Sequence, residues 1–280
     1  GEDNPSRARY YNTMEALYAD SQIKINVAGT VESIAEITAD LLYSCYRTFY
    51  NLSNMVLVTS GDITMEQVLA VADKVLPMQD EKKIVRCYNA EKAEVNKKRV
   101  KIKMAVSKPM FEIGIKDIEI PADPKELLKK SIAGSVLYDM LFGTTSDFAI
   151  DVYESGLVRG FGAGYSLDHV FGMGELVGES DDPEAVYDKF VKYVEKKKKA
   201  GLDRSEFERI KKANYASLVK SFDSTQNIAN NVTYMLLDVI DIMDYSKSVA
   251  DVSFEYTEEL LCKLFDEKYY AMSVVEPLDK

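Results

Sequence analysis

The sequence predicts an α+β protein with two structural units. Apolar residues recur at helical spacing in several stretches, which is the pattern of amphipathic helices that pack on a core. Other stretches alternate apolar and polar residues or form short runs of β-branched residues, which indicates strands. The chain from Pro77 to Lys98 is polar, charged and without either period, so we place the boundary between the units there.

The residues before this boundary predict helices and one strand. Helical spacing of apolar residues is found at 7–20, 33–50 and 64–76. Thr38 is an expected N-cap, because its hydroxyl can accept a hydrogen bond from a backbone amide of the first helical turn. The β-branched run from Met55 to Thr59 ends at Ser-Gly-Asp and predicts a buried strand.

Strands and helices also alternate in the longer region after the boundary. Residues 100–106 and 111–115 predict two half-buried strands, and the glycine-rich stretch 160–180 predicts paired strands. Asp123 and Pro124 open a helix that Gly143 ends, because Asp caps the first amides and Pro is tolerated at the first helical position. The remaining predictions are helices at 146–153, 181–200, 203–240 with a break near 221–224, and from 257, then a strand at 270–275.

Two distant stretches of the chain resemble each other. Residues 33–42 and 253–261 each predict a capped amphipathic helix, and a short apolar strand follows each of them. We interpret this as the ends of two related domains, of which the first has lost its beginning. Chance similarity of two ordinary helices is the alternative.

Charge and composition exclude several classes of function. The net charge of −11 repels phosphate backbones and anionic lipids, so we expect neither nucleic acid nor membrane as a partner. No apolar run reaches the roughly 20 residues that a membrane helix requires. The three cysteines have no metal-ligand spacing, which favours buried structural thiols, a reducing compartment and a cytoplasmic location.

Catalytic and metal-binding patterns are missing from the sequence. His169 is the single histidine, so a His-x-x-Glu-His zinc motif and a histidine triad are impossible within this chain, and we expect no catalytic and no metal-ligating residue. His169 itself is expected in a turn. The glycines from Gly160 to Gly164 favour paired strands over a phosphate loop, because no helix follows them. The run Lys196 to Lys199 is typical of a helix end.

Three segments carry a resemblance to a known family. They are Glu-Ala-Leu-Tyr at 15–18, the stretch 25–38 with Gly-Thr-Val-Glu-Ser-Ile, and the stretch 49–63 with Tyr-Asn-Leu-Ser-Asn-Met. In these the chain resembles the insulinase/pitrilysin family of zinc peptidases, the inverzincins related to mitochondrial processing peptidase. It is most similar to the bacterial processing-protease-like branch. Leu-Phe-Gly at 141–143 and Glu-Ser-Gly-Leu at 154–157 resemble the second domain of that family.

The resemblance implies a fold and a division of the chain. The family has pairs of homologous α+β domains, each a two-layer structure with helices on one face of a sheet. Residues 1–79 would be the C-terminal part of the first, catalytic-type domain, 80–98 a linker, and 99–280 the complete second, non-catalytic domain. The chain would then be a truncated fragment. The zinc ligands of the family would lie upstream of Gly1, so zinc is expected in the full-length parent and no cofactor in this chain.

The resemblance also implies a function. The two domains of the family enclose a chamber for peptide, which here Ser146, Arg159, Phe161 and Tyr165 would line. The chamber-facing Arg and Tyr that help to bind substrate in many members are not evident here, since Arg159 stands where Tyr is common, so anchoring of substrate by that pair is not carried over. The leading hypothesis is a part of a zinc-dependent peptidase that positions a peptide or unfolded polypeptide, inactive by itself. The alternative is a non-catalytic scaffold subunit, and the partner in either case is the missing N-terminal domain or a homologous subunit.

Overall fold

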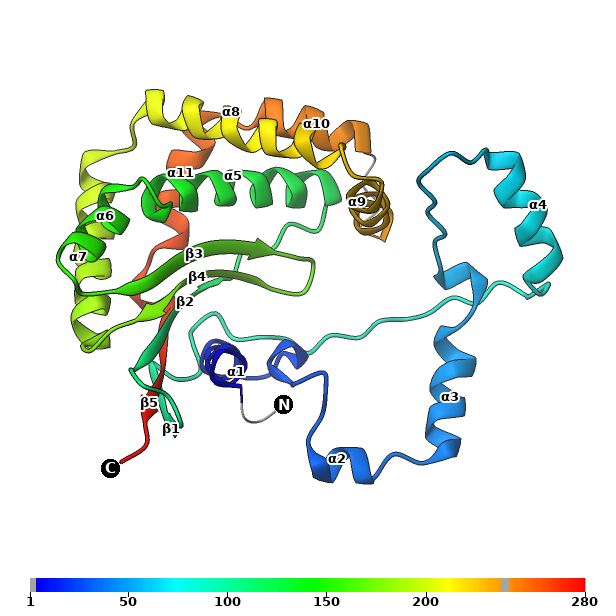
Figure 1. Ribbon diagram of the computed structural model, residues 1–280, viewed down its shortest axis with the longest axis horizontal. Coiled ribbons are helices and arrows are strands. Elements are labelled where there is room, and N and C mark those ends of the chain that lie inside the picture. Colours follow the sequence, from blue (N-terminus) through cyan, green and yellow to red (C-terminus); the bar gives the residue numbers. More distant parts are fainter. Residues whose placement is uncertain (1–3, 238–241, 280) are drawn as a thin grey trace. The chain divides into compact units, whose positions relative to one another are not determined.

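The computed structural model describes residues 4–237 and 242–279 (Figure 1). Residues 238–240, which we expected to be helical, lie outside the described residues. The helices are α1 Pro5–Leu17, α2 Val31–Ala35, α3 Ala39–Phe49, α4 Met65–Val75, α5 Pro124–Phe142, α6 Asp147–Glu154, α7 Pro183–Ala200, α8 Arg204–Ser221, α9 Thr225–Leu237, α10 Ile242–Asp251 and α11 Phe254–Leu264. The strands are β1 Arg99–Met104, β2 Met110–Asp117, β3 Arg159–Leu167, β4 Gly172–Glu179 and β5 Tyr270–Pro277. Short 3₁₀ turns lie at Gln22–Lys24, Leu52–Asn54 and Glu267–Tyr269.

The five strands form one sheet in the order β1-β5-β2-β4-β3. β1 pairs with β5 in parallel, and the other three pairs are antiparallel. All five strands come from residues 99–277, and α5, α7 and α11 cover one face of the sheet (Figure 1). The predicted α+β fold class is confirmed, and the main layer of helices lies on one face of the sheet as expected.

α1 lies on the opposite face of the sheet from α5 (Figure 1). Two glycines in adjacent strands permit this arrangement. A Cβ on Gly114 would lie 2.7 Å from the Thr13 methyl group of α1, and a Cβ on Gly174 would lie 1.6 Å from the Tyr138 hydroxyl of α5. Because α1 covers the second face, β2 is buried on both sides, and our prediction of a half-buried strand there was wrong.

Contacts divide the described chain into two compact units. Unit 1 comprises 1–28, 88–214 and 247–280, and unit 2 comprises 29–87 and 215–246. The units therefore do not follow the order of the chain, since 1–28 belong with the sheet. The division into 1–79, 80–98 and 99–280 concerned the relation to the family and stays a prediction.

Most predicted helix caps are present in the structure. The predicted caps Thr38 and Asp123 accept hydrogen bonds from first-turn amides of α3 and α5, and Asp182 does the same for α7. The last helix begins at Phe254 with Ser253 as its cap, three residues before the start that we predicted at Thr257. Thr257 instead lies one turn inside, fully buried, where its hydroxyl donates to the Ser253 carbonyl.

The predicted buried strand at Met55 to Thr59 is not formed in this chain. The segment has no regular secondary structure, and Met55, Val56 and Leu57 are 45%, 41% and 66% exposed. No strand of the described residues pairs with it, and an extended segment without a ladder partner leaves its amides to solvent. Its β-branched composition is suited to a sheet that these residues do not contain.

The core of unit 1 is aromatic and lies between the sheet and the helices that cover it. Phe142 is 1% exposed, and its ring lies within 6.1 Å of the rings of Tyr138, Phe148, Phe190, Tyr193 and Phe265. Within the described ranges, no helix combines the length and apolarity needed to cross a membrane.

Candidate functional site

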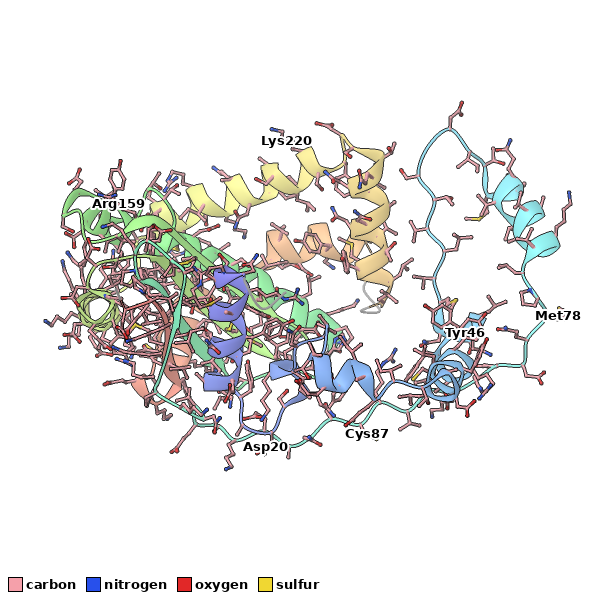
Figure 2. All side chains as sticks on the ribbon, turned by 60° about the horizontal axis from the view of Figure 1, so that its bottom comes forward. Asp20, Tyr46, Met78, Cys87, Arg159 and Lys220 are labelled. Carbon is pink, nitrogen blue, oxygen red and sulfur yellow. The ribbon has the colours of Figure 1, made fainter. Side chains whose placement is uncertain are left out.

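Three of the four predicted chamber-lining residues lie on β3, and the fourth lies apart from them. Arg159 is exposed at the start of β3 (Figure 2), whereas Phe161 and Tyr165 are half-buried. Ser146 is 2% exposed and is the N-cap of α6, where its hydroxyl accepts a hydrogen bond from the Ala149 amide at 3.1 Å. Its side chain is therefore committed to a helix start, and β3 is where the predicted residues come together.

A buried polar network fixes Tyr165. Its hydroxyl donates to Asp117 Oδ2 at 2.6 Å, and its ring stacks on Tyr138. Asp117 also accepts from the Lys130 ammonium, and these two side chains are 3% and 4% exposed. Burial, together with the neighbouring Asp117 carboxylate, raises the pKa of Tyr165 far above its ordinary value. Tyr165 is thus a neutral hydrogen-bond donor that ties β3 to β2 and α5.

The two edges of the sheet differ in chemistry. β1 carries Arg99, Lys101 and Lys103, which form ion pairs with Glu184, Glu276 and Asp279. β3 carries no charged residue after Arg159, and its sequence from 160 to 164 alternates glycine with Phe161 and Ala163. Charged side chains on an edge strand oppose pairing with a further strand. Within the described residues β3 pairs with β4 alone, so β3 is the edge that can accept another extended chain.

The face of the sheet under α1 carries an unusual acidic cluster. Arg9 of α1 donates to Glu112 Oε2 at 3.0 Å, and Glu112 is 1% exposed. Glu112 Oε1 and the neighbouring Ser273 Oγ are buried without a hydrogen-bond partner in the described part of the chain. Burial, and then the charge of Glu175, raise the pKa of Glu112 to about 7, although Arg9 lowers it. This carboxyl group can therefore change its charge near neutral pH.

Unit 2 presents a second candidate surface, which is apolar. One side of α3 forms a surface hollow of about 510 Å³, with Leu42, Tyr46 and Phe49 in its lining. These side chains are 59%, 58% and 49% exposed. A second hollow, of about 270 Å³, lies between α4 and the segment from Leu57 to Ile63. Figure 2 draws the side chains of this region, with Tyr46 of α3 labelled.

The described residues do not fit a zinc ion. Zinc in proteins takes three or four Cys, His, Asp or Glu ligands at one point, and no such group exists in residues 4–237 and 242–279. His169 lies in the turn between β3 and β4, 52% exposed, with its Nε2 3.3 Å from Asp168. We therefore derive no catalytic step through zinc in this chain.

The burial of several charged side chains of β2 was not apparent from the sequence. Glu112 and Lys116 alternate with Ile113 and Ile115, a pattern that predicts a solvent-facing side, yet all of them are buried. No local signal in the sequence indicated this burial, because it depends on elements that pack on the second face of the sheet, such as α1.

Comparisons with known proteins agree with this architecture. Over 267 residues the chain is 29% identical to the zinc protease YmfH of Bacillus subtilis (strain 168), covering 93% of this chain and 61% of the relative. The chain thus spans less than two thirds of that relative's length. The crystal structure of an M16-like peptidase from Alicyclobacillus acidocaldarius is 27% identical, with a TM-score of 0.92 over 99% of this chain and 67% of the other. A protease from Helicobacter pylori shares the fold at 16% identity, with a TM-score of 0.83 over 99% of this chain and 68% of the other.

The family match covers most of the chain and agrees with the resemblance to insulinase and pitrilysin. Residues 36–214 match the family described as Peptidase M16 inactive domain. This range includes α3, α5 and four of the five strands of the sheet, β1 to β4. The chain belongs to the M16 family of zinc peptidases and carries its inactive domain.

Proposed function

We propose that this chain is the substrate-positioning part of a zinc-dependent peptidase and that it holds an extended polypeptide along the β3 edge. The observation that carries the proposal is the contrast between the charged edge strand β1 and the uncharged, glycine-rich edge strand β3. An extended peptide can add to an exposed strand through main-chain hydrogen bonds, which give affinity with little dependence on sequence. This suits a peptidase that accepts unfolded polypeptide.

Charge favours a basic peptide. The chain has a net charge of −11, and Glu175 of β4 lies beside the glycines of β3, 3.6 Å from where a Cβ of Gly164 would be. The predicted chamber residues Arg159, Phe161 and Tyr165 lie on the same strand. Phe161 and Tyr165 contact the core rings Phe148 and Tyr138, which holds β3 in place before a peptide arrives.

The test uses one exposed position in the middle of the edge. Ala163 is exposed, so it tolerates substitution. Ala163→Lys would give β3 the kind of charge that β1 has, and we expect it to weaken binding of an unstructured basic peptide about tenfold. Ala163→Val is the matched control, because valine suits an edge strand and adds no charge. Equal affinities for the two variants, measured by fluorescence anisotropy, contradict the proposal.

Catalysis itself is proposed to reside outside the described residues. We expect the chain to bind the peptide without hydrolysing it, with or without added zinc, because the described residues offer no ligand cluster. Mass spectrometry of the peptide after incubation checks this. Turnover that a chelator abolishes contradicts it.

A partner that covers the apolar surface of unit 2 is the second part of the proposal. α3 and α4 each expose an apolar side, and the extended segment at 55–59 has no ladder partner. The two helices need a sheet to cover their apolar sides, and the extended segment needs a strand to pair with. We propose that a homologous α+β domain or subunit of the same family supplies that sheet. In the alternative, a non-catalytic scaffold subunit, the whole protein lacks the zinc motif. A His-x-x-Glu-His sequence in the complete reading frame would therefore favour the peptidase hypothesis over the scaffold hypothesis.

A further inference from the structure

A buried ion pair in unit 1 fastens two chain segments that lie far apart in the sequence. Lys116 of β2 is 2% exposed and donates to Glu91 Oε1 at 2.8 Å. The same ammonium donates to the carbonyls of Lys92 and Glu94, at 2.6 and 3.2 Å. Since an ammonium has three hydrogens, all three of its donors are used.

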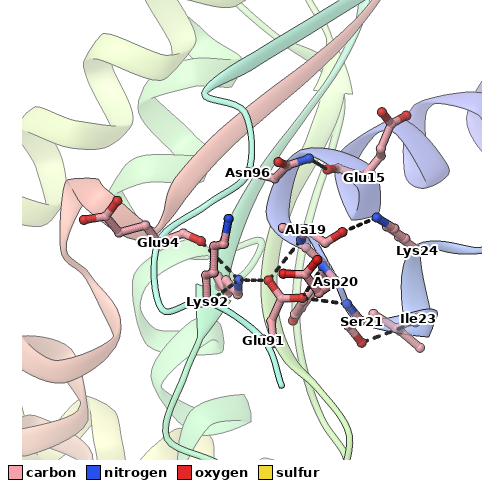
Figure 3. A network of polar contacts seen from close by, with 12 residues as sticks. Glu15, Ala19, Asp20, Ser21, Ile23, Lys24, Glu91, Lys92, Glu94 and Asn96 are labelled. Carbon is pink, nitrogen blue, oxygen red and sulfur yellow. Dashed lines mark hydrogen bonds and ion pairs between the residues drawn. The ribbon is translucent and has the colours of Figure 1, made fainter. Parts of the chain in front are cut away.

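The carboxylate of Glu91 occupies a site made of backbone amides. It accepts from the N–H groups of Ala19, Asp20 and Ser21 at 2.9, 2.8 and 2.6 Å (Figure 3). Successive backbone N–H groups that converge in this way form a concave anion-binding nest. α1 ends at Leu17, so these three amides lie beyond the helix and have no carbonyl partner within it.

The position of this site in the chain is significant. Residues 19–21 precede the connection into unit 2 at 28–29, and residues 91–94 follow the return connection at 87–88. The Glu91–Lys116 pair therefore joins the outgoing segment, the returning segment and the middle strand of the sheet at one point. The Tyr18 hydroxyl, which donates to the Gly172 carbonyl at 2.7 Å, holds the same corner from the other side.

We propose that Glu91 and Lys116 form a latch that fixes both segments to the sheet. The segments that lead into and out of residues 29–87 are then attached to the sheet at a single point. Opening the latch frees both segments together and leaves the sheet intact. The inference does not depend on peptide binding, and its test contains no peptide, so the two proposals stand or fall separately.

Electrostatics keep this latch closed at physiological pH. Burial alone would raise the pKa of Glu91, but the bonds from Lys116 and the three amides lower it to about 2. A carboxyl group whose pKa is lower in the folded state than in the unfolded state stabilises the fold at any pH above the unfolded-state pKa. That contribution is lost only as the pH falls through the folded-state pKa. The latch is therefore a fixed anchor rather than a pH switch.

The test measures amide hydrogen exchange in the full 280-residue chain. In Glu91→Ala we expect exchange at Ala19, Asp20 and Ser21 to accelerate by about tenfold or more, because charge-assisted bonds to the amides are lost. Amides of β2 and β5 should accelerate much less than these three, although the loss of its carboxylate partner leaves Lys116 of β2 less well paired. Sodium formate should slow exchange at the three amides again by filling the vacated nest, whereas sodium chloride at equal ionic strength should not.

Two further variants make the test specific. Glu15→Gln is the matched control, because it removes the nearby Lys97–Glu15 ion pair, whose side chains are 50% and 48% exposed, and should leave the three amides unchanged. Glu91→Gln keeps the shape and one acceptor oxygen and should give an intermediate acceleration. The proposal is overturned by unchanged exchange at the three amides in Glu91→Ala, by failure of formate to restore it, or by an equal acceleration throughout β2 and β5, which would make the pair a support of the whole fold.

Discussion

The two units of this chain use their large apolar side chains in opposite ways. In unit 1 these side chains pack against one another between the sheet and its helices, and Phe142, Phe190 and Phe265 are at most 1% exposed. In unit 2, α3 and α4 have strongly amphipathic sequences, yet their apolar sides are exposed. The difference lies in what covers each helix. An amphipathic sequence indicates that one side of a helix packs against another element, but it does not indicate which element that is.

The largest expected difference between the two units is in the loss of stability when one aromatic ring in each is truncated. Phe142→Ala should lower the free energy of unfolding by about 3 to 5 kcal/mol, because it leaves a cavity among five aromatic neighbours. Phe49→Ala in α3 should cost less than about 1 kcal/mol, because that ring is 49% exposed. Urea denaturation followed by far-UV circular dichroism measures both. Similar losses in the two variants would show that α3 is covered in solution.

The next effect concerns charges that are buried in unit 1. Lys130→Met should cost about 3 kcal/mol, because Asp117 then remains buried without its cation. Lys101→Met, on the exposed edge strand β1, is the control and should change stability by less than about 0.5 kcal/mol. The same denaturation experiment decides. A loss below 1 kcal/mol for Lys130→Met would mean that water reaches Asp117.

A pH-dependent effect should also distinguish the units. The pKa of Glu112 rises from 4.5 to about 7 on folding, chiefly through burial and then through Glu175. Because the folded pKa is the higher one, the unfolding free energy falls as pH rises from 4.5 to 7, by up to about 3 kcal/mol. Glu112→Gln should remove this dependence and stabilise unit 1 at pH 8, measured by thermal unfolding. In unit 2 the carboxyl groups of Glu32 and Glu66 have lowered pKa values through hydrogen bonds at helix starts, so pH should not weaken it in this range.

An unchanged slope of stability against pH in Glu112→Gln would contradict that assignment. Glu175→Gln is a useful second variant, because burial also raises the pKa of Glu175 and its charge adds to that of Glu112. It should reduce the dependence without abolishing it.

The smallest effect tests how helices without a covering layer are held. α4 has a capping box in which Thr64 accepts from the Gln67 amide and the Gln67 side chain accepts from the Thr64 amide. Thr64→Ala should cost about 1 kcal/mol, and hydrogen exchange should show the loss within α4 rather than in unit 1. Thr64→Ser keeps the hydroxyl and is the control. Equal protection of α4 in both variants would show that tertiary contacts, not the cap, hold this helix.

Local sequence chemistry predicted most elements of this chain because they depend on near neighbours. Asp123 and Pro124 predicted the start of α5, and Gly143 predicted its end. The same logic placed the hairpin of β3 and β4 and the turn that contains His169. The predicted strand at 55–59 was wrong for the converse reason, since a strand forms only where another strand supplies hydrogen bonds.

The candidate site was predicted in part. The resemblance to a peptidase family directed attention to Arg159, Phe161 and Tyr165, which the structure brings together on β3. It gave no indication that Ser146 is a buried cap or that β3 is an uncharged edge, because both depend on which elements lie next to them. Whether these residues line a peptide chamber stays a prediction.

The sequence by itself determined the family, the fold class, the positions of most helices and the lack of a second histidine that zinc chemistry of this kind requires. The tertiary structure decided the order of the strands, the placement of α1 on the second face of the sheet, and the burial of Glu112, Lys116 and Asp117. The physical reason is the distance along the sequence between the residues that interact. Caps, turns and periodicity involve residues a few positions apart, whereas burial of a charge depends on partners such as Glu91, 25 residues from Lys116, that come near only when the whole unit folds.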